Sequence, residues 1–201
     1  GFGYLETRDG TLLSVNVRLP DSDIYGPGPY PTVIQYSGYA PSKPGSPSGA
    51  DAGGFLAGTM GFAYVGVNVR GSGCSGGVFD VFNPAQMADG YDAIEAIASQ
   101  DWVANNKVGM IGLSYAGISQ LYVASTQPPS LAAISPLSIY DDTVRGVLAP
   151  GGIFNEGFAL EWAENVLDNA EPYGQGWEQA VVDAGDETCA ENQLLRGQNV
   201  D

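Results

Sequence analysis

The sequence predicts an α/β fold in which a mostly parallel sheet carries helices on both faces. Two observations indicate this class. Between residues 32 and 139, apolar runs typical of buried strands alternate with runs of helical periodicity, which favours parallel strands joined by right-handed crossovers. The 201 residues are also 44% hydrophobic and only 15% charged, as in globular rather than disordered chains.

The first elements are expected to be strands. Asp9-Gly10 is a turn signal between two strand-like runs, so it predicts a hairpin that adds an antiparallel edge to the sheet. Residues 11–19 form the second of these runs, and residues 32–36 and 62–69 have the apolar character of buried strands. Residues 39–54 are rich in Pro, Ser and Gly and predict a loop.

A helix is predicted to begin after Asn83 and to end near Gln100. Asn83 suits the capping position, Pro84 suits the first helical position, and Gln86 is placed to reach back as in a capping box. Apolar residues then recur at helical spacing.

Beyond this helix, the pattern predicts a strand over residues 108–113, a helix over 118–125 and a strand over 131–139. From about Thr143 the composition changes. Acidic residues become frequent, no further strand pattern occurs, and apolar residues recur at helical spacing. We therefore interpret residues 144–201 as the start of a separate helical element.

Charge and composition exclude several kinds of partner. Acidic residues number 23 against 7 basic ones, and a net charge of −16 repels phosphate backbones, so no nucleic-acid partner is expected. No apolar stretch is long enough to cross a bilayer, so no membrane partner is expected. Histidine is absent and the carboxylates lack ligand spacing, so neither a metal centre nor another cofactor is expected.

Cys74 and Cys189 are the only cysteines. They form either one disulfide across a long loop, as in an oxidising compartment, or two buried free thiols. A nucleophilic cysteine is not expected, because no histidine is present to activate it. The compartment stays open, with an extracellular or cell-envelope location favoured over the cytoplasm.

The sharpest chemical feature is residues 112–117, which read Gly-Leu-Ser-Tyr-Ala-Gly between a predicted strand and a predicted helix. This is the context of a nucleophile elbow, in which an abrupt turn strains the serine and exposes its hydroxyl. Small neighbours let the helix pass close to the strand, and the helix N-terminus stabilises negative charge. Ser114 is therefore the candidate nucleophile, with Ala116 in place of the usual second glycine. The alternative is an ordinary tight turn with an accidental serine.

A second glycine-rich segment, residues 71–77, matches the spacing G-x-G-x-x-G after a strand. A dinucleotide site needs a helix that starts directly at those glycines. Here residues 78–82 intervene, so we interpret the segment as a flexible loop. The alternative, a nucleotide-binding oxidoreductase, predicts a helix that begins at Gly76.

Several short motifs match one known family. They are Arg8-Asp9-Gly10, Val69-Arg70-Gly71, Asp101-Trp102, Pro150-Gly151-Gly152 and, above all, residues 112–117. Along nearly its whole length, the chain resembles the cocaine esterase and X-Pro dipeptidyl-peptidase family of serine hydrolases, within the α/β-hydrolase superfamily.

The resemblance implies an α/β-hydrolase core, a helical cap and, in complete members, a C-terminal jelly-roll domain. Residues 1–143 are then the N-terminal part of the catalytic domain, and residues 144–201 are the incomplete start of the cap. The resemblance also implies an oxyanion hole made by the Tyr115 N–H and the Tyr39 hydroxyl. The alternative for Tyr39 is a half-buried packing aromatic, and Tyr36 is a weaker candidate for the same role.

In this family the triad acid and histidine follow the cap, whereas this chain contains no histidine. The general base is therefore expected in the remainder of a longer chain, and this fragment is expected to be inactive alone. We interpret Asp141 and Asp142 as loop or cap-hinge residues. The aromatic residues Phe158, Trp162 and Trp177 either line a pocket beneath the cap or form its helix core.

Two classes of function follow from these features. The first is a serine-dependent hydrolase whose substrates are small-molecule esters or amides, or short peptides with an X-Pro bond. It forms an acyl-enzyme on Ser114. The second is a non-catalytic α/β module that binds a ligand or a partner.

Overall fold

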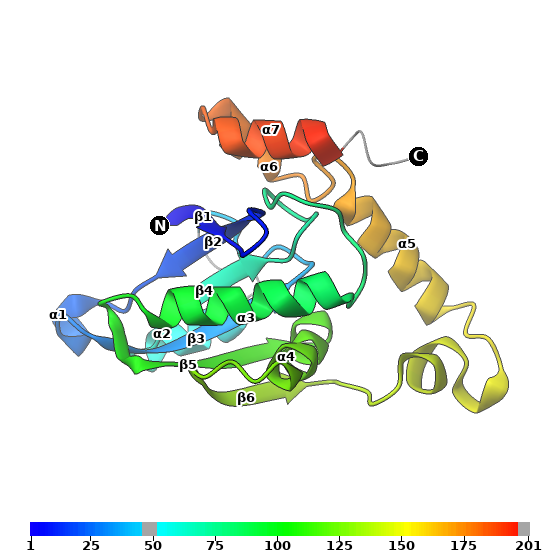
Figure 1. Ribbon diagram of the computed structural model, residues 1–201, viewed down its shortest axis with the longest axis horizontal. Coiled ribbons are helices and arrows are strands. Elements are labelled where there is room, and N and C mark those ends of the chain that lie inside the picture. The colour runs from blue at the N-terminus through cyan, green and yellow to red at the C-terminus, as the bar shows by residue number, and fades with distance from the viewer. Residues whose placement is uncertain (46–51, 197–201) are drawn as a thin grey trace.

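The computed structural model describes residues 1–45 and 52–196 (Figure 1). Its centre is a six-stranded sheet with the order β1-β2-β4-β3-β5-β6, which confirms the predicted α/β class. The strands are β1 (Phe2–Glu6), β2 (Leu12–Arg18), β3 (Tyr30–Ser37), β4 (Ala63–Asn68), β5 (Val103–Leu113) and β6 (Leu131–Leu137). The helices are α1 (Ser22–Tyr25), α2 (Ala52–Thr59), α3 (Pro84–Ala98), α4 (Tyr115–Ser125), α5 (Phe158–Ala170), α6 (Glu178–Asp183) and α7 (Glu187–Arg196). A π-helical turn (Val144–Leu148) and a 3-10 turn (Pro150–Gly152) lie between β6 and α5.

Strand pairing follows the predicted pattern. β1 and β2 form an antiparallel hairpin around Asp9-Gly10, and β2 also runs antiparallel to β4. β4, β3, β5 and β6 are parallel, so their carboxyl ends lie at one edge of the sheet. The loops that leave this edge are where an α/β fold places its site.

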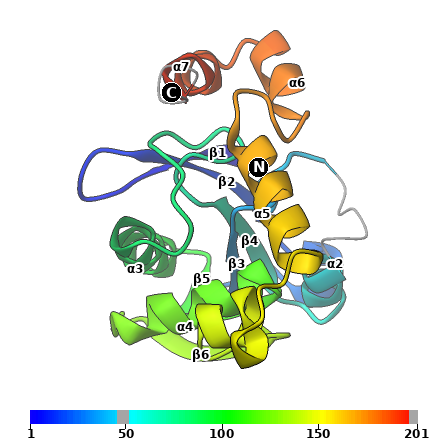
Figure 2. The same ribbon diagram turned by 90° about the vertical axis from the view of Figure 1, so that its right-hand side faces the viewer.

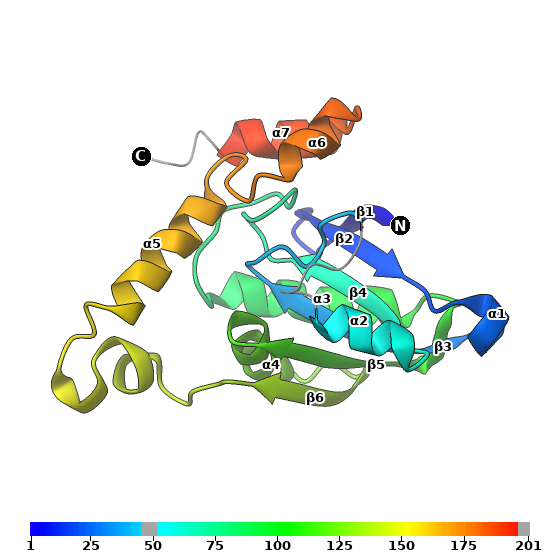
Figure 3. The same ribbon diagram turned by 180° about the vertical axis from the view of Figure 1, so that it is seen from behind.

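Helices cover both faces of the sheet. α3 and α4 lie on the face turned to the viewer in Figure 1, and α2 lies on the opposite face, seen in Figure 3. Successive side chains of the central strands lie on opposite faces of the sheet. Ile34 and Val65 belong to the main core with α3 and α4, whereas Val33 and Tyr64 pack with Ala57 of α2. Because both of its faces are covered, β4 is buried along its whole length and is mostly apolar, with the polar Asn68 at its end.

The short helix α1, helix α2 and the start of β5 differ from the sequence-based expectation. α2 was not expected, because Gly53, Gly54 and Gly58 hide its helical character; residues 46–51 of the predicted loop lie outside the described residues. β5 begins at Val103, five residues before the predicted strand. Asn105 and Asn106 have positive φ and form an irregularity within β5, which is why this stretch lacks a strand pattern.

The start of α3 is close to the predicted capping box. Asn83 Oδ1 accepts a hydrogen bond from the Gln86 N–H at 2.8 Å, and Pro84 is the first helical residue. The Gln86 side chain, however, accepts from the Phe82 N–H at 3.2 Å rather than from that of Asn83. This hydrogen bond ties the helix to the preceding loop as well as to its own first turn.

The glycine-rich segment after β4 is a loop, as predicted, and a disulfide and several hydrogen bonds tie it to α7. Cys74 and Cys189 form a disulfide, and both are fully buried. The Arg196 guanidinium donates to the carbonyls of Gly73 and Ser75, each at 2.8 Å. Burial lowers the pKa of Arg196 to about 10. These contacts fasten the loop to α7. The next helix is α3, so the alternative helix at Gly76 is excluded.

A buried ion pair fixes the base of this loop. The Arg70 guanidinium donates to both carboxylate oxygens of Asp89 at 2.6 and 2.5 Å, and the Asp89 side chain is 1% exposed. Arg70 also donates to Asp9 at 2.8 Å, which holds the pKa of that carboxyl below its usual range. The hairpin turn, the loop and α3 are therefore joined through one guanidinium.

The segment after β6 is helical, as predicted. α5 runs beside the carboxyl edge of the sheet and leads to α6 and α7, which lie over the first hairpin and the glycine-rich loop (Figure 2). Trp177 packs edge-on against Phe2, and the Tyr4 hydroxyl donates to Asp186 at 2.8 Å. These contacts hold the end of the chain against its beginning. Within the described residues, no helix is both long enough and apolar enough to cross a lipid bilayer.

We predict that Asp89→Ala lowers the free energy of unfolding by about 3–5 kcal/mol, because it leaves the Arg70 charge largely buried without its main partner. Asp92→Ala is the matched control on the same helix, since its partner Arg8 is exposed, and we expect a much smaller change. Urea unfolding measures both values. Equal effects would contradict the structural role of the buried pair.

We predict that the double variant Cys74→Ala, Cys189→Ala loses about 2–5 kcal/mol of stability, because the disulfide joins residues 115 positions apart and constrains the unfolded chain. Urea unfolding of the oxidised protein and of this variant tests the expectation. Mass spectrometry of the alkylated protein before reduction should find no free thiol; two alkylated cysteines would show that the bond does not form.

Candidate active site

Ser114 lies at an abrupt bend between β5, which ends at Leu113, and α4, which begins at Tyr115. Its φ of 58° and ψ of −121° are unfavourable for any residue other than glycine, at a cost of about 1–3 kcal/mol. Serine is a good capping residue, yet the Ser114 side chain makes no capping hydrogen bond to α4. The Ser114 hydroxyl is therefore not engaged in capping α4.

Two glycines make room for the bend. A Cβ added at Gly112 would collide with the Ala116 side chain and lie 2.8 Å from the Ala116 carbonyl oxygen. A Cβ at Gly117 would lie 2.5 Å from the Leu137 carbonyl oxygen of β6. Ala116 fits in place of the usual second glycine because Gly112 has no side chain.

Backbone hydrogen bonds fasten the bend on both sides. The Ser114 N–H donates to the Leu137 carbonyl at 2.9 Å, which anchors it to β6. The Ser114 carbonyl accepts from the N–H groups of Gly117 and Ile118, each at 2.8 Å, and so starts α4. The Tyr115 N–H is at the helix N-terminus, where an N–H has no partner within the helix and is available to an anion.

The Tyr115 side chain anchors the bend in the interior. It is fully buried, and its ring lies 4.6 Å from Phe82, 5.7 Å from Tyr39 and 6.1 Å from Trp162 between ring centres. Its hydroxyl donates to Gln86 Oε1 at 2.9 Å, and burial raises its pKa. The residue after Ser114 thus joins the bend to the start of α3, the loop after β3 and helix α5.

Tyr39 is fixed at the loop that follows β3. Its carbonyl oxygen accepts from Asn68 Nδ2 and from Gln175 Nε2, each at 2.6 Å. Its hydroxyl accepts from the indole Nε1–H of Trp162 at 3.1 Å. Both its backbone and its side chain are therefore held by other parts of the chain.

Ser114 and Tyr39 line one cavity of about 730 Å³ that extends from the carboxyl edge of the sheet along its α2 face. Its other walls come from α2, the turn between α2 and β4, and strands β3, β5 and β6, and most of them are apolar: Val33, Gln35, Gly53, Leu56, Ala57, Met60, Phe62, Ile111, Gly112, Leu113, Ser135 and Leu137. The cavity places a hydroxyl beside a predominantly apolar surface, as ligand sites commonly do.

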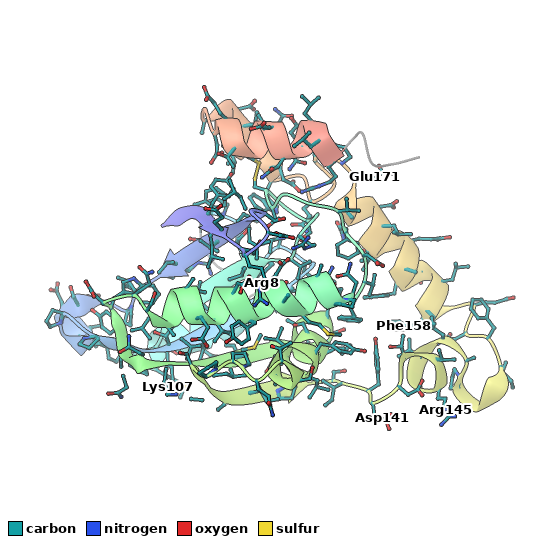
Figure 4. The ribbon with its side chains drawn as sticks, in the orientation of Figure 1. Arg8, Lys107, Asp141, Arg145, Phe158 and Glu171 are labelled. Atoms are coloured by element: carbon teal, nitrogen blue, oxygen red, sulfur yellow. A yellow bond between two sulfur atoms is a disulfide. The ribbon has the colours of Figure 1, made fainter. Side chains whose placement is uncertain are left out.

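Other sequence-derived candidates lie elsewhere. Tyr36 is buried, and its hydroxyl donates to the Gln86 carbonyl at 2.8 Å, so it is not directed into this cavity. Asp142 accepts from the Arg145 N–H at 2.8 Å and stabilises the turn after β6. Asp141, Arg145 and Phe158 lie on the segment that leads away from the sheet (Figure 4). Trp177 packs beside the disulfide, as helix core.

Three polar residues form hydrogen bonds with Tyr39 or Tyr115 that the sequence does not predict. Gln86 was assigned only to helix capping, and no local signal marks Asn68 or Gln175, because their partners are distant in sequence. The assembled site offers a strained hydroxyl, a helix N-terminus and a phenol. The chain contains no histidine, so it brings no imidazole base to them.

We predict that Gly117→Ala destabilises the protein by about 1–3 kcal/mol, because the new methyl group meets the Leu137 carbonyl. Gly109→Ala is the control on β5, where an added Cβ meets nothing closer than 3.6 Å. Urea unfolding should show a loss for the first variant and little change for the second. If Gly117→Ala left the free energy of unfolding unchanged, α4 and β6 would not be packed so closely.

Comparison with known proteins places the chain in a family. Residues 9–199 match the X-Pro dipeptidyl-peptidase (S15) family. The chain is 31% identical over 157 residues to the cocaine esterase of Rhodococcus sp. (strain MB1 Bresler), which covers 78% of this chain and 26% of that protein. It therefore spans about a quarter of the length of that relative.

Solved structures agree with this match. The crystal structure of a CocE/NonD family hydrolase from Staphylococcus aureus superposes with a TM-score of 0.72 at 30% identity, over 84% of this chain and 33% of that chain. An α-amino acid ester hydrolase superposes with a TM-score of 0.62 at 26% identity, over 73% of this chain and 26% of that one. The chain therefore has the α/β-hydrolase fold and belongs to the X-Pro dipeptidyl-peptidase (S15) family.

Proposed function

We propose that the chain carries the nucleophile of a serine hydrolase that cleaves ester or amide bonds, X-Pro peptide bonds among them, through an acyl-enzyme on Ser114. The observation that carries the proposal is the strained conformation of Ser114 between β5 and α4. The Ser114 hydroxyl does not cap the helix, and the residue lines a cavity. Strain of this kind persists at functional sites because it holds a group in position for chemistry. Membership of a family named for a peptidase, with an esterase among its relatives, supports the reaction class.

In the proposed mechanism, the Ser114 oxygen attacks the acyl carbon while a general base takes its proton. The carbonyl oxygen becomes an oxyanion that accepts hydrogen bonds from the Tyr115 N–H and the Tyr39 hydroxyl. Collapse of the tetrahedral intermediate expels the alcohol or amine with a proton and leaves the acyl group on Ser114. Water then releases the acid and restores the serine.

We propose that the base and its orienting acid belong to the remainder of a longer chain. Histidine is absent from these 201 residues, and this chain spans 26% of the cocaine esterase that it resembles. Asp141 and Asp142 then need no catalytic role, which fits their position on the segment leading to the cap. We also propose residues 1–143 as catalytic core and 144–201 as the start of the cap.

The disulfide supports a proposal about location. Buried disulfides that close long loops accumulate in proteins that mature in oxidising compartments. The Cys74–Cys189 bond therefore favours an extracellular or cell-envelope location for the protein.

The test of the proposed reaction uses the full-length protein and a p-nitrophenyl ester. We expect Ser114→Ala to lower kcat by about 10⁴-fold or more, because the nucleophile is lost. Ser125→Ala is the control, since Ser125 is an exposed serine at the end of the same helix and should leave turnover unchanged. Full turnover by Ser114→Ala would show that Ser114 is not the nucleophile, and no turnover by the parent on any ester or X-Pro amide would favour a non-catalytic binding module.

A companion test concerns the missing base. We expect residues 1–201 alone to hydrolyse the same ester at a rate at least about 10³-fold below that of the full-length protein, because removing one triad member removes most of the triad's effect. Circular dichroism should first show that the shortened protein is folded. Comparable turnover by the two proteins would mean that these residues contain their own base.

A further inference from the structure

The hydrogen bond between Trp162 and Tyr39 has a fixed direction. Trp162 lies on α5, 123 residues from Tyr39 in the sequence, and its Nε1 lies 3.1 Å from the Tyr39 hydroxyl oxygen. An indole N–H can only donate, so the Tyr39 oxygen is the acceptor. A Tyr39 hydroxyl hydrogen turned towards the indole would meet the indole hydrogen, so it points elsewhere.

The hydrogen of the Tyr39 hydroxyl is consequently not used by this contact. A phenol has one hydrogen to donate and two lone pairs, of which Trp162 takes one. Within the described residues, 1–45 and 52–196, no group accepts a hydrogen bond from the Tyr39 hydroxyl. Tyr39 nevertheless borders the cavity that Ser114 also lines. A hydroxyl that accepts one hydrogen bond is also polarised into a better donor for the next.

The same region of the chain holds the Tyr39 backbone. Gln175, which follows α5, donates from Nε2 to the carbonyls of Gly38 and Tyr39 at 2.8 and 2.6 Å. The Trp162 ring also lies against the Tyr115 ring, with centres 6.1 Å apart. The cap segment thus reaches both residues to which the proposed function assigns the oxyanion hole.

We propose that Trp162 is a positioning residue for Tyr39. Its indole N–H fixes the Tyr39 hydroxyl with its hydrogen towards the oxyanion of the reacting acyl group, so that the cap segment completes the oxyanion hole. The proposal rests on the proposed function, because it requires Tyr39 to be an oxyanion donor.

The test is a double-mutant cycle in the full-length protein with a p-nitrophenyl ester. We expect Tyr39→Phe to lower kcat by about 10²–10³-fold, as for other lost oxyanion donors. Trp162→Phe should lower kcat by about tenfold, the effect of one lost hydrogen bond, with KM nearly unchanged. In the Tyr39→Phe background, Trp162→Phe should have no further effect on kcat, because the hydroxyl that it positions is gone.

A second variant separates the hydrogen bond from packing. Replacing Trp162 with 3-benzothienylalanine keeps the bicyclic shape and removes only the N–H, so it should lower kcat as much as Trp162→Phe does. Leu167→Ala is the control on the same helix, since Leu167 is 59% exposed, and it should leave kcat unchanged.

Four results would overturn the proposal. A kcat loss from Trp162→Phe that is equally large in the Tyr39→Phe background, or a raised KM with unchanged kcat, would make Trp162 a packing or substrate contact. Wild-type kcat with benzothienylalanine would do the same. All of these leave the proposed function intact. If Tyr39→Phe alone keeps full kcat, the failure lies in the oxyanion role given to Tyr39 by the proposed function, and the positioning role falls with it.

Discussion

The bend at Ser114 is the constraint on which the rest of the site depends. A serine with φ of 58° is unfavourable on its own, so the conformation persists only because its surroundings permit no other. β6 binds its N–H through the Leu137 carbonyl, and Gly117 lets α4 press against the same carbonyl. The buried Tyr115 ring adds a further restraint, since a relaxed bend would move this ring out of its aromatic cluster.

The other conspicuous interactions secure the loops that surround this bend. Arg70 joins the glycine-rich loop to α3 and to the first hairpin through two carboxylates. The disulfide and Arg196 join the same loop to α7. Gln175 and α5 precede α7 in the chain, so these contacts also keep residues 158–176 close to Tyr39. Residues far apart in sequence therefore converge on the carboxyl edge of the sheet, which is the usual location of sites in this fold.

Much of the fold could be predicted from local signals. Apolar runs gave the strands, Asn83 with Pro84 marked the start of α3, and the small residues around Ser114 gave the bend between strand and helix. Local signals failed where glycines disguised α2 and where Asn105 and Asn106 interrupted β5. They left two alternatives for the cysteines, which only the tertiary structure resolves. The contacts of Gln175 and Trp162 with Tyr39 span more than a hundred residues, so no local pattern encodes them.

In the proposed mechanism, Ser114 is an acyl-accepting nucleophile with an oxyanion site beside it. The most direct measurement is a crystal structure of the full-length protein after reaction with an alkyl phosphonate ester. We expect one phosphorus bonded to Ser114 Oγ, with a phosphonyl oxygen about 2.7–3.1 Å from both the Tyr115 nitrogen and the Tyr39 hydroxyl. An unmodified Ser114, or an adduct whose oxygen faces neither group, would contradict the claim.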